Sequence, residues 1–160
     1  MMKTTDFRKS TVYQIYPKSF YDSNGDGLGD LRGVIRKLDY IQELGVDYIW
    51  MTPFFVSPQN DNGYDVEDYY NIDPRYGTME DVEELIRKAD KRGIRLMFDM
   101  VFNHVSSRHE WFQKAMEGDP YYKDFFFFKK GKENGEPPTN WESKFGGSAW
   151  EYVEKFDEYY

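Results

Sequence analysis

The third apolar run of the chain ends in Asp99-Met100-Val101-Phe102-Asn103-His104, where apolar residues give way to an acid, an amide and an imidazole. The run begins after Gly93, and its composition favours a β-strand over residues 94–102. A buried strand needs only apolar residues until it reaches the surface, so polar groups at its end are typical of a ligand site. The stretch predicts a strand of a buried sheet and one wall of a binding site.

Two further strands and two helices precede this run. Residues 11–16 and 46–51 are short apolar segments rich in β-branched and aromatic residues, which indicates strands. Apolar residues recur at helical spacing over residues 31–44, and a capping box opens a second helical pattern after Thr78. The order strand, helix, strand, helix, strand predicts an α/β fold with a parallel sheet and right-handed crossovers.

Ligand sites of such sheets lie beyond the carboxyl ends of the strands. The segments that leave those ends are residues 17–30, residues 52–77 and the chain from Asn103 onward, and all three are long and polar. We therefore expect the functional residues in these three segments.

Composition narrows the class of protein. The 160 residues are 39% hydrophobic and 19% aromatic, enough to fill the core of one ordinary domain. The formal charge of -8 disfavours nucleic acid and anionic membranes as partners. Cysteine is absent, which excludes a disulfide framework and favours a reducing compartment. Residues 1–10 show no apolar segment of a signal peptide, so we expect a cytoplasmic protein without a membrane span.

The segment Asp22-Ser23-Asn24-Gly25-Asp26-Gly27-Leu28-Gly29-Asp30 places oxygen-bearing side chains at alternating positions. Hard oxygen donors at that spacing suit Ca²⁺, with the Leu28 carbonyl as a backbone ligand, and they match the first nine positions of an EF-hand loop. Position twelve is Gly33 in place of the bidentate Glu, which disfavours an EF-hand sensor. We predict a structural calcium site, and the alternative is a loop of Asx turns formed for local reasons.

The segment Gln59-Asn60-Asp61-Asn62-Gly63-Tyr64-Asp65 lies in the loop after the second strand. Carboxylates and amides can bind sugar hydroxyls, and Tyr64 can stack on a sugar ring. The same residue types also form ordinary turns. Because Asp99 and His104 are expected at the same sheet edge, we favour a carbohydrate site. A histidine at a strand end is also common as a structural residue that bonds a backbone carbonyl.

These segments together resemble the alpha-amylase superfamily, glycoside hydrolase family 13, in its intracellular alpha-glucosidase branch. The resemblance covers residues 12–152 and rests on Tyr13-Gln14-Ile15-Tyr16-Pro17, Gly45-Val46-Asp47, Trp50-Met51-Thr52-Pro53 and residues 99–104. It implies the N-terminal portion of a TIM (β/α)₈ barrel, with about three strands and two helices, over residues 1–104. Residues 105–160 would begin an inserted domain B.

The resemblance also implies hydrolysis of α-glucosidic bonds with retention. Three segments restrict the choice among the substrates of this branch. They are Tyr16-Pro17-Lys18-Ser19-Phe20, Ser57-Pro58-Gln59 and Pro138-Thr139-Asn140-Trp141-Glu142-Ser143-Lys144-Phe145-Gly146-Gly147-Ser148-Ala149-Trp150. They look most like branch members that convert trehalose 6-phosphate to glucose and glucose 6-phosphate. Members that act on α-1,6-linked oligosaccharides or on dextran are the alternative. The expected partner is a small oligosaccharide or a disaccharide phosphate.

Position by position, the resemblance implies roles for single residues. Asp61 would bind hydroxyls of the terminal glucose, Tyr64 would stack on it, and His104 would donate to a hydroxyl of the same ring. Asp99 would support the pocket and Phe145 would form a wall. The implied Ca²⁺ ligands are Asp22, Asn24, Asp26, Asp30 and the carbonyl of Leu28.

Retaining hydrolysis requires two carboxyl groups about 5 Å apart, and in this family both come from later strands. No acid in residues 1–160 matches either motif, so no catalytic residue is assigned. Two hypotheses of different class follow: a partial glucosidase, or a non-catalytic, calcium-stabilised sugar-binding fragment. An incomplete barrel leaves strand edges exposed, and a third hypothesis is that the chain assembles with copies of itself or with a complementary chain.

Overall fold

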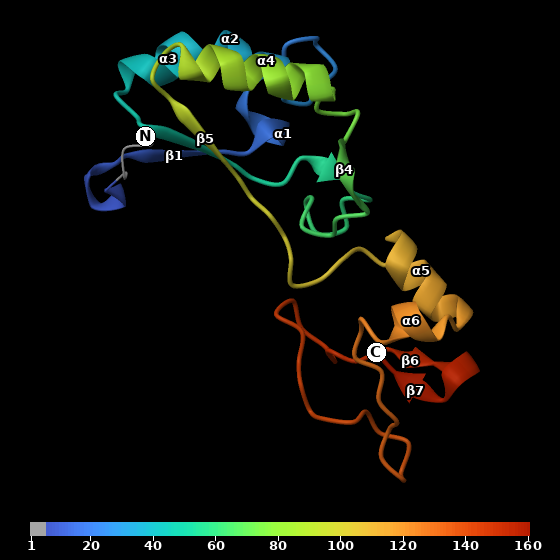
Figure 1. Ribbon diagram of the computed structural model, residues 1–160. Coiled ribbons are helices and arrows are strands. Elements are labelled where there is room, and N and C mark those ends of the chain that lie inside the picture. Colours follow the sequence, from blue (N-terminus) through green and yellow to red (C-terminus); the bar gives the residue numbers. More distant parts are fainter. Residues whose placement is uncertain (1–5) are drawn as a thin grey trace. The chain divides into compact units, whose positions relative to one another are not determined.

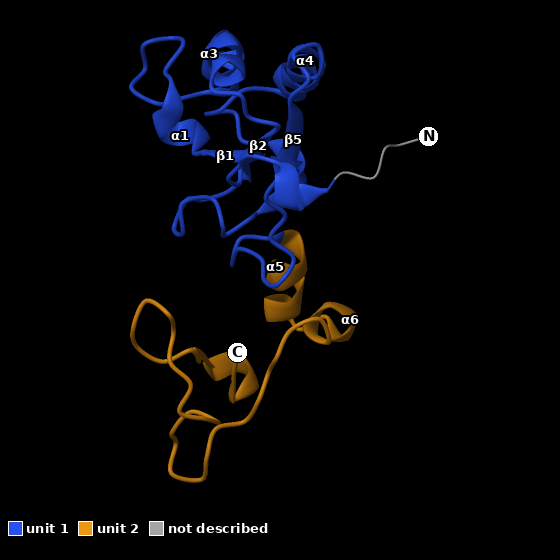
Figure 2. Ribbon diagram, turned by 90° about the vertical axis from the view of Figure 1, so that its left-hand side faces the viewer, with its two compact units in different colours: residues 1–109 blue, residues 110–160 orange. Residues whose placement is uncertain are grey.

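The computed structural model describes residues 6–160. The chain divides into two compact units, residues 1–109 and residues 110–160 (Figure 2). The predicted lack of an apolar leader in residues 1–10 rests partly on residues 1–5, which lie outside the described residues. The predicted division of the chain at residue 104 refers to the architecture of the resembled family and stays a prediction.

The first unit is built around a parallel sheet of three strands in the order β1-β2-β5 (Figure 1). The strands are β1 (Val12–Ile15), β2 (Tyr48–Met51) and β5 (Arg95–Phe98). Ile15 pairs with Met51, and Met51 pairs with Phe98, so the three carboxyl ends lie in one row. The predicted parallel sheet is confirmed, and the segments after the strands leave it from one edge.

Helices α2, α3 and α4 lie together on one side of this sheet (Figure 1). Their bounds are Leu31–Arg36, Leu38–Glu43 and Met79–Asp90, and two shorter elements precede them, η1 (Phe7–Lys9) and α1 (Pro17–Phe20). The buried core comprises Ile15, Leu31, Val34, Leu38, Ile41, Val46, Ile49, Met51, Phe54, Tyr76, Val82, Leu85, Ala89 and Ile94. Residues from the sheet and from all three helices therefore share one core.

Helix α4 begins with the predicted capping box. The Thr78 hydroxyl accepts the N–H of Asp81, and the Asp81 carboxylate accepts the N–H of Thr78 at 2.9 Å. Two of the helix's first N–H groups therefore have partners, which fixes its start.

One helix was predicted over residues 31–44, but the structure has two, which meet at Lys37. The backbone of Lys37 has φ -100° and ψ 6°, and its N–H donates to the carbonyls of Gly33 and Val34. Leu31 and Leu38, on either side of the break, are both fully buried. The spacing of apolar residues predicted which positions are buried. It did not predict the break at Lys37, because one continuous helix and two helices that meet there bury the same positions.

The strand predicted over residues 94–102 is shorter than expected, since β5 ends at Phe98. Among the described residues 6–160, the one bond that continues the pairing beyond Phe98 is that of the Asp99 N–H to the carbonyl of Met51, at 3.1 Å. The segment of residues 52–77, expected as a loop, contains a hairpin of β3 (Phe55–Val56) and β4 (Asp68–Ile72). This antiparallel pair gives the polar loop residues a rigid base.

Two glycines let the chain pack closely beside α1. A Cβ atom on Gly29 would lie 2.1 Å from the carbonyl oxygen of Pro17, and one on Gly33 would lie 1.9 Å from that of Tyr21. These distances are far below van der Waals contact, so backbone would have to move to admit any side chain. The loop of residues 22–30 is therefore pressed against the segment that follows β1.

The second unit contains two helices, a short hairpin and a 3-10 turn, α5 (Glu110–Glu117), α6 (Pro120–Lys123), β6 (Tyr152–Val153), η2 (Glu154–Phe156) and β7 (Glu158–Tyr159). Phe112 is buried, and its ring lies 4.9 Å from that of Tyr160 and 5.2 Å from that of Phe126. Aromatic contacts thus join the start and the end of this unit. No helix within residues 6–160 has the length and apolar character needed to cross a membrane.

Candidate functional site

Polar side chains meet where β2 and β5 end. Asp99 directly follows β5, and its N–H bond to Met51 keeps it level with the end of β2. Tyr64, in the loop after β3, donates its hydroxyl to Asp99 Oδ2 at 3.0 Å. Two of the predicted site residues, 35 positions apart in the sequence, are therefore in direct contact.

The environment of Tyr64 keeps its hydroxyl protonated. Burial raises the pKa of Tyr64 to about 12, and the hydrogen bond to the negatively charged Asp99 acts in the same direction. A phenolate is unfavourable both away from water and beside a carboxylate. Tyr64 is thus a hydrogen-bond donor to Asp99 at neutral pH and not a base.

His104 contacts the same residue through the backbone. Its Nε2 lies 3.1 Å from the carbonyl oxygen of Tyr64, and its Nδ1 lies 3.4 Å from the side-chain amide of Asn103. Because a carbonyl only accepts, we infer that Nε2 carries the proton and that Asn103 donates to Nδ1. This is the backbone bond that the sequence left open as the alternative to a ligand role. Donation from Nε2 to a sugar hydroxyl requires the ring to leave the Tyr64 carbonyl.

Tyr69 fixes the segment beyond β5. Its hydroxyl donates to the carbonyl of Val101 and lies 3.1 Å from the carbonyl of His104. Its ring stacks beside that of Phe102, with 6.4 Å between centroids, and burial raises the pKa of its hydroxyl. A side chain from the hairpin therefore replaces the missing strand pairing of residues 100–104. The sequence assigned no role to Tyr69.

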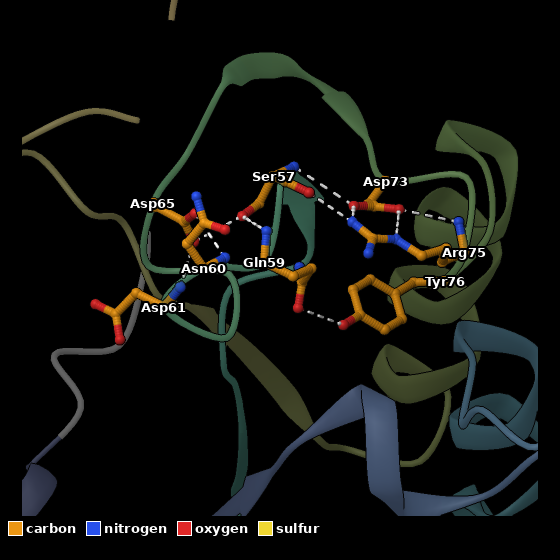
Figure 3. A network of polar contacts seen from close by, with 8 residues as sticks. All are labelled: Ser57, Gln59, Asn60, Asp61, Asp65, Asp73, Arg75 and Tyr76. Carbon is orange, nitrogen blue, oxygen red and sulfur yellow. Dashed lines mark hydrogen bonds and ion pairs between the residues drawn. The ribbon is translucent and has the colours of Figure 1, made fainter. Parts of the chain in front are cut away.

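A second group of contacts closes the turn that carries Asp61 and Tyr64 (Figure 3). Asp65 Oδ1 accepts the Ser57 hydroxyl at 2.9 Å and the N–H of Asp61 at 3.0 Å. Asp65 Oδ2 accepts the N–H of Asn60 at 2.9 Å. One carboxylate therefore holds both the start and the middle of the turn.

The start of the turn is attached to the end of β4 by Asp73 and Arg75 (Figure 3). Asp73 is 2% exposed and forms an ion pair with Arg75, whose guanidinium also donates to the carbonyl of Ser57. Burial alone raises the pKa of a carboxyl, but the hydrogen bonds from Arg75 outweigh it, and the pKa of Asp73 lies below its ordinary value. Asp73 is therefore charged in the folded protein.

The backbone of this turn is strained. Gln59 has φ 64°, Asn62 has φ 50° and Gly63 has φ 100°. The left-handed region costs a non-glycine residue about 1–2 kcal/mol. Such conformations persist where the surrounding contacts fix them. The hydrogen bonds of Asp65 to the turn and of Tyr76 to Gln59 supply those contacts.

Asp61 differs from its neighbours in the turn. Its N–H and C=O are bonded to Asp65 and Tyr64, but within residues 6–160 no hydrogen bond is made to its carboxylate. Figure 3 shows the carboxylate pointing away from the network. An anchored backbone with an unpaired carboxylate suits a residue that binds a ligand.

Phe145, the fifth predicted site residue, belongs to the second unit. Its side chain is 85% exposed, and its N–H donates to the hydroxyl of Ser143. Its predicted place in the wall of the site stays a prediction.

The predicted calcium loop forms a series of Asx turns. Asp22 accepts the N–H groups of Asn24, Gly25 and Gly27, while Asn24 and Asp26 accept those of Asp26 and Leu28. The N–H bonds from the two glycines hold the pKa of Asp22 below its ordinary value. Local hydrogen bonding, the alternative reading of this segment, is therefore present.

The last acid of the loop, Asp30, has another role. Asp30, 6% exposed, accepts the N–H of Gly33 at 2.6 Å and so caps α2, and its other oxygen accepts the N–H and hydroxyl of Ser23. Within residues 6–160 no three acidic or imidazole groups cluster as a metal centre. The free lone pairs of Asp22, Asn24 and Asp26 still fit an oxygen-preferring cation, because a carboxylate can accept about four contacts.

The model of the alpha-amylase catalytic domain matches residues 14–160. The chain belongs to the alpha-amylase family. As a member of that family it is the N-terminal portion of a TIM barrel, which confirms the predicted fold class. The three parallel strands of the first unit are strands of this barrel.

The relatives of this alpha-amylase family chain include two kinds of hydrolase. Trehalose-6-phosphate hydrolase of Bacillus subtilis (strain 168) is 55% identical over 159 residues, which are 99% of this chain and 28% of that protein. Oligo-1,6-glucosidase of Heyndrickxia coagulans is 53% identical over 96% of this chain and 28% of that protein. The crystal structure of Bacillus licheniformis trehalose-6-phosphate hydrolase matches with a TM-score of 0.92 and 58% identity, over 96% and 28% of the two chains. The chain thus spans 28% of the length of these relatives.

Proposed function

We propose that the protein carrying this chain hydrolyses α-glucosidic bonds, and that its substrate is trehalose 6-phosphate. The observation that carries the proposal is that Tyr64, beyond the ends of β2 and β5, bonds the Asp99 carboxylate, the His104 ring and the backbone carbonyl of Asp61. The 55% identity to a trehalose-6-phosphate hydrolase supports the choice of substrate.

In this proposal the chain forms one wall of the site. Asp61 binds hydroxyls of the terminal glucose through its unpaired carboxylate. The ring of Tyr64 stacks on the sugar while its hydroxyl donates to Asp99, which sets the ring's orientation. His104 donates to the same sugar ring once its Nε2 leaves the carbonyl of Tyr64, and the family resemblance assigns Phe145 to another side of the sugar. These residues bind and orient, and they carry out no bond cleavage.

Bond cleavage with retention needs a nucleophile and an acid that later acts as a base. We propose that both carboxyl groups come from family segments that residues 1–160 do not span. The test uses residues 1–160 alone, incubated with p-nitrophenyl α-glucoside and with trehalose 6-phosphate. We expect no product. Release of glucose by residues 1–160 would overturn this assignment.

The substrate is tested on the whole protein that carries residues 1–160, called the full chain below. Its turnover of trehalose 6-phosphate is compared with its turnover of isomaltose. We expect a higher kcat/KM for the phosphorylated disaccharide. The oligo-1,6-glucosidase at 53% identity makes α-1,6-linked glucosides the second candidate. Faster turnover of isomaltose would establish the second candidate. If the full chain binds sugar but turns over neither compound, a non-catalytic sugar-binding role is correct.

We also propose a structural Ca²⁺ held by Asp22, Asn24, Asp26, Asp30 and the carbonyl of Leu28, with Asp30 retaining its cap on α2. Bound ion would stabilise the folded chain by about 2.7 kcal/mol at a hundredfold excess over its Kd. Thermal unfolding with Ca²⁺ and with chelator should differ for the unchanged chain but not for Asp26→Ala. Asp90→Ala is the control, because Asp90 is an exposed acid outside the loop. A chelator without effect on the unchanged chain would contradict the site.

The proposed location is the cytoplasm, supported by the absence of cysteine. The proposed partner is a small sugar or sugar phosphate, and the excess of acidic residues argues against nucleic acid and anionic membrane surfaces. Cell fractionation with an antibody to this chain measures the location, and enrichment in the extracellular fraction would contradict it.

A further inference from the structure

We propose that Asp65 is a positioning residue that aims the Asp61 carboxylate at the substrate. This inference rests on the proposed function, because that function assigns Asp61 to the sugar. The proposed function gives Asp65 no contact with the sugar: its carboxylate accepts hydrogen bonds, within residues 6–160, from the Ser57 hydroxyl and from the N–H groups of Asn60 and Asp61.

The hold on Asp61 is direct. Asp65 Oδ1 accepts the Asp61 N–H at 3.0 Å, and the Asp61 carbonyl accepts the N–H of Tyr64 at 2.9 Å. Both peptide groups that flank the Asp61 Cα are therefore bonded within the turn. The direction of its side chain follows from this backbone, and the carboxylate points out of the network (Figure 3).

The charge of Asp65 suits this task. Its partners are two backbone N–H groups and one hydroxyl, and the two oxygens of a carboxylate can accept all three. An asparagine offers only one acceptor oxygen and so cannot reproduce the whole set. It can still accept from Ser57 and Asp61, which makes Asp65→Asn a graded variant beside Asp65→Ala.

The frame behind Asp65 is fixed independently of the substrate. Ser57, which donates to Asp65, is bonded through its backbone to the buried Asp73 and to Arg75, the ion-pair partner of Asp73 (Figure 3). The strained residues Gln59 and Asn62 lie inside the same turn. A strained turn without its central acceptor relaxes, and Asp61 moves with it.

The first experiment measures kcat and KM of the full chain for its α-glucoside substrate in a double-mutant cycle. Asp65→Ala should reduce kcat/KM about 100-fold, which is the order of loss that a displacement of 1 Å causes. The fall in kcat and the rise in KM should contribute to this loss in the same proportion as they do in Asp61→Ala. The double variant carries both Asp61→Ala and Asp65→Ala. Its kcat/KM should differ from that of Asp61→Ala alone by no more than about twofold.

Two variants separate positioning from general damage. Asp65→Asn should recover part of the loss, because it keeps the bond to the Asp61 N–H. Glu67→Gln is the matched control two residues along the chain, and its kinetics should not change. Additive losses in the double variant, or unchanged kinetics of Asp65→Ala, would overturn the proposal.

The second experiment needs no substrate. Amide hydrogen exchange of Asn60 and Asp61 should accelerate in Asp65→Ala, while the amides of β2 remain protected. If the unchanged full chain turns over no α-glucoside, the proposed function fails while faster exchange still supports the positioning. Unchanged exchange at both amides would overturn the positioning whether or not the enzyme is active.

Discussion

Tyr64 joins three features of the site. Its hydroxyl bonds Asp99, its carbonyl bonds His104, and its N–H bonds the carbonyl of Asp61. A single residue therefore links the two loops that follow β2 and β5. Its ring and its hydroxyl have separate tasks, which substitution can tell apart.

Tyr64→Phe keeps the ring and removes only the hydroxyl. We expect the free energy of unfolding to fall by about 1 kcal/mol, because Asp99 loses a donor. Sugar binding should weaken less than in Tyr64→Ala, which also removes the stacking face. Thermal unfolding and equilibrium binding measure the two effects. Tyr70→Phe is the control, since Tyr70 is 85% exposed, and equal effects of Tyr64→Phe and Tyr70→Phe would refute the role of the hydroxyl.

The pair of Asp73 and Arg75 makes stability depend on acid pH. The pKa of Asp73 is lowered by folding, so its contribution is complete above the unfolded pKa of about 4 and is lost as the pH falls through the lower folded value. Asp73→Asn lacks this contribution at every pH and should be less stable at neutral pH by roughly 1–3 kcal/mol.

Chemical unfolding as a function of pH measures this difference. The gap between the unchanged chain and Asp73→Asn should be constant above pH 5 or so and should narrow below about pH 4. Asp90→Asn, at an exposed acid outside the network, should show no such gap. A gap that widens on acidification would contradict the assigned direction of the pKa shift.

At the scale of elements, the sequence was sufficient where the signal is local. The three parallel strands are short apolar runs, and α4 begins at a capping box that can be read from four residues. The carboxyl-end row of β1, β2 and β5 follows from the strand order alone. The sequence therefore predicted that Tyr64 and Asp99 lie near each other, but it did not predict the hydrogen bond between them.

The rest depends on partners distant in the sequence. Asp65 was part of the predicted motif, but its role depends on where Ser57 lies after β3. The sequence assigned no role to Asp73 and Arg75, because only the hairpin of β3 and β4 brings them to Ser57. The strand over residues 94–102 was overestimated because apolar residues continue past Phe98 while pairing with β2 does not.

The cap of α4 is a test at this scale. Thr78→Ala removes the hydroxyl that accepts the N–H of Asp81 and should lower the free energy of unfolding by about 1 kcal/mol. Thr78→Ser keeps the acceptor and should stay close to the unchanged chain. Denaturant titration measures both, and equal stability of the alanine and serine variants would show that the hydroxyl of the capping box contributes nothing.

At the scale of the whole molecule, the chain matches the N-terminal portion of a TIM barrel. β1 and β5 are the outer strands of the three-stranded sheet that the described residues form. Large apolar side chains are exposed, including Phe102 at 78%. In the longer relatives the matched region is only 28% of the chain, so we expect other parts of the family architecture to cover such surfaces.

Residues 1–160 alone should therefore associate in solution, because unpaired strand edges and apolar surface favour contact between copies. Light scattering should show species larger than one chain, and thermal unfolding should be broad. The full chain is the control. A monodisperse monomer with a sharp, reversible transition would show that this part is stable by itself.

The close approach at Gly29 and Gly33 sets the mutational tolerance of the first loop. Every codon change that replaces either glycine adds a Cβ to a space that a carbonyl oxygen already occupies. Gly25 and Gly27 lie in open space with positive φ, where asparagine or aspartate is the mildest replacement. Saturation mutagenesis of residues 22–33 should therefore show no tolerated replacement at Gly29 and Gly33, and tolerance limited mainly to asparagine and aspartate at Gly25 and Gly27.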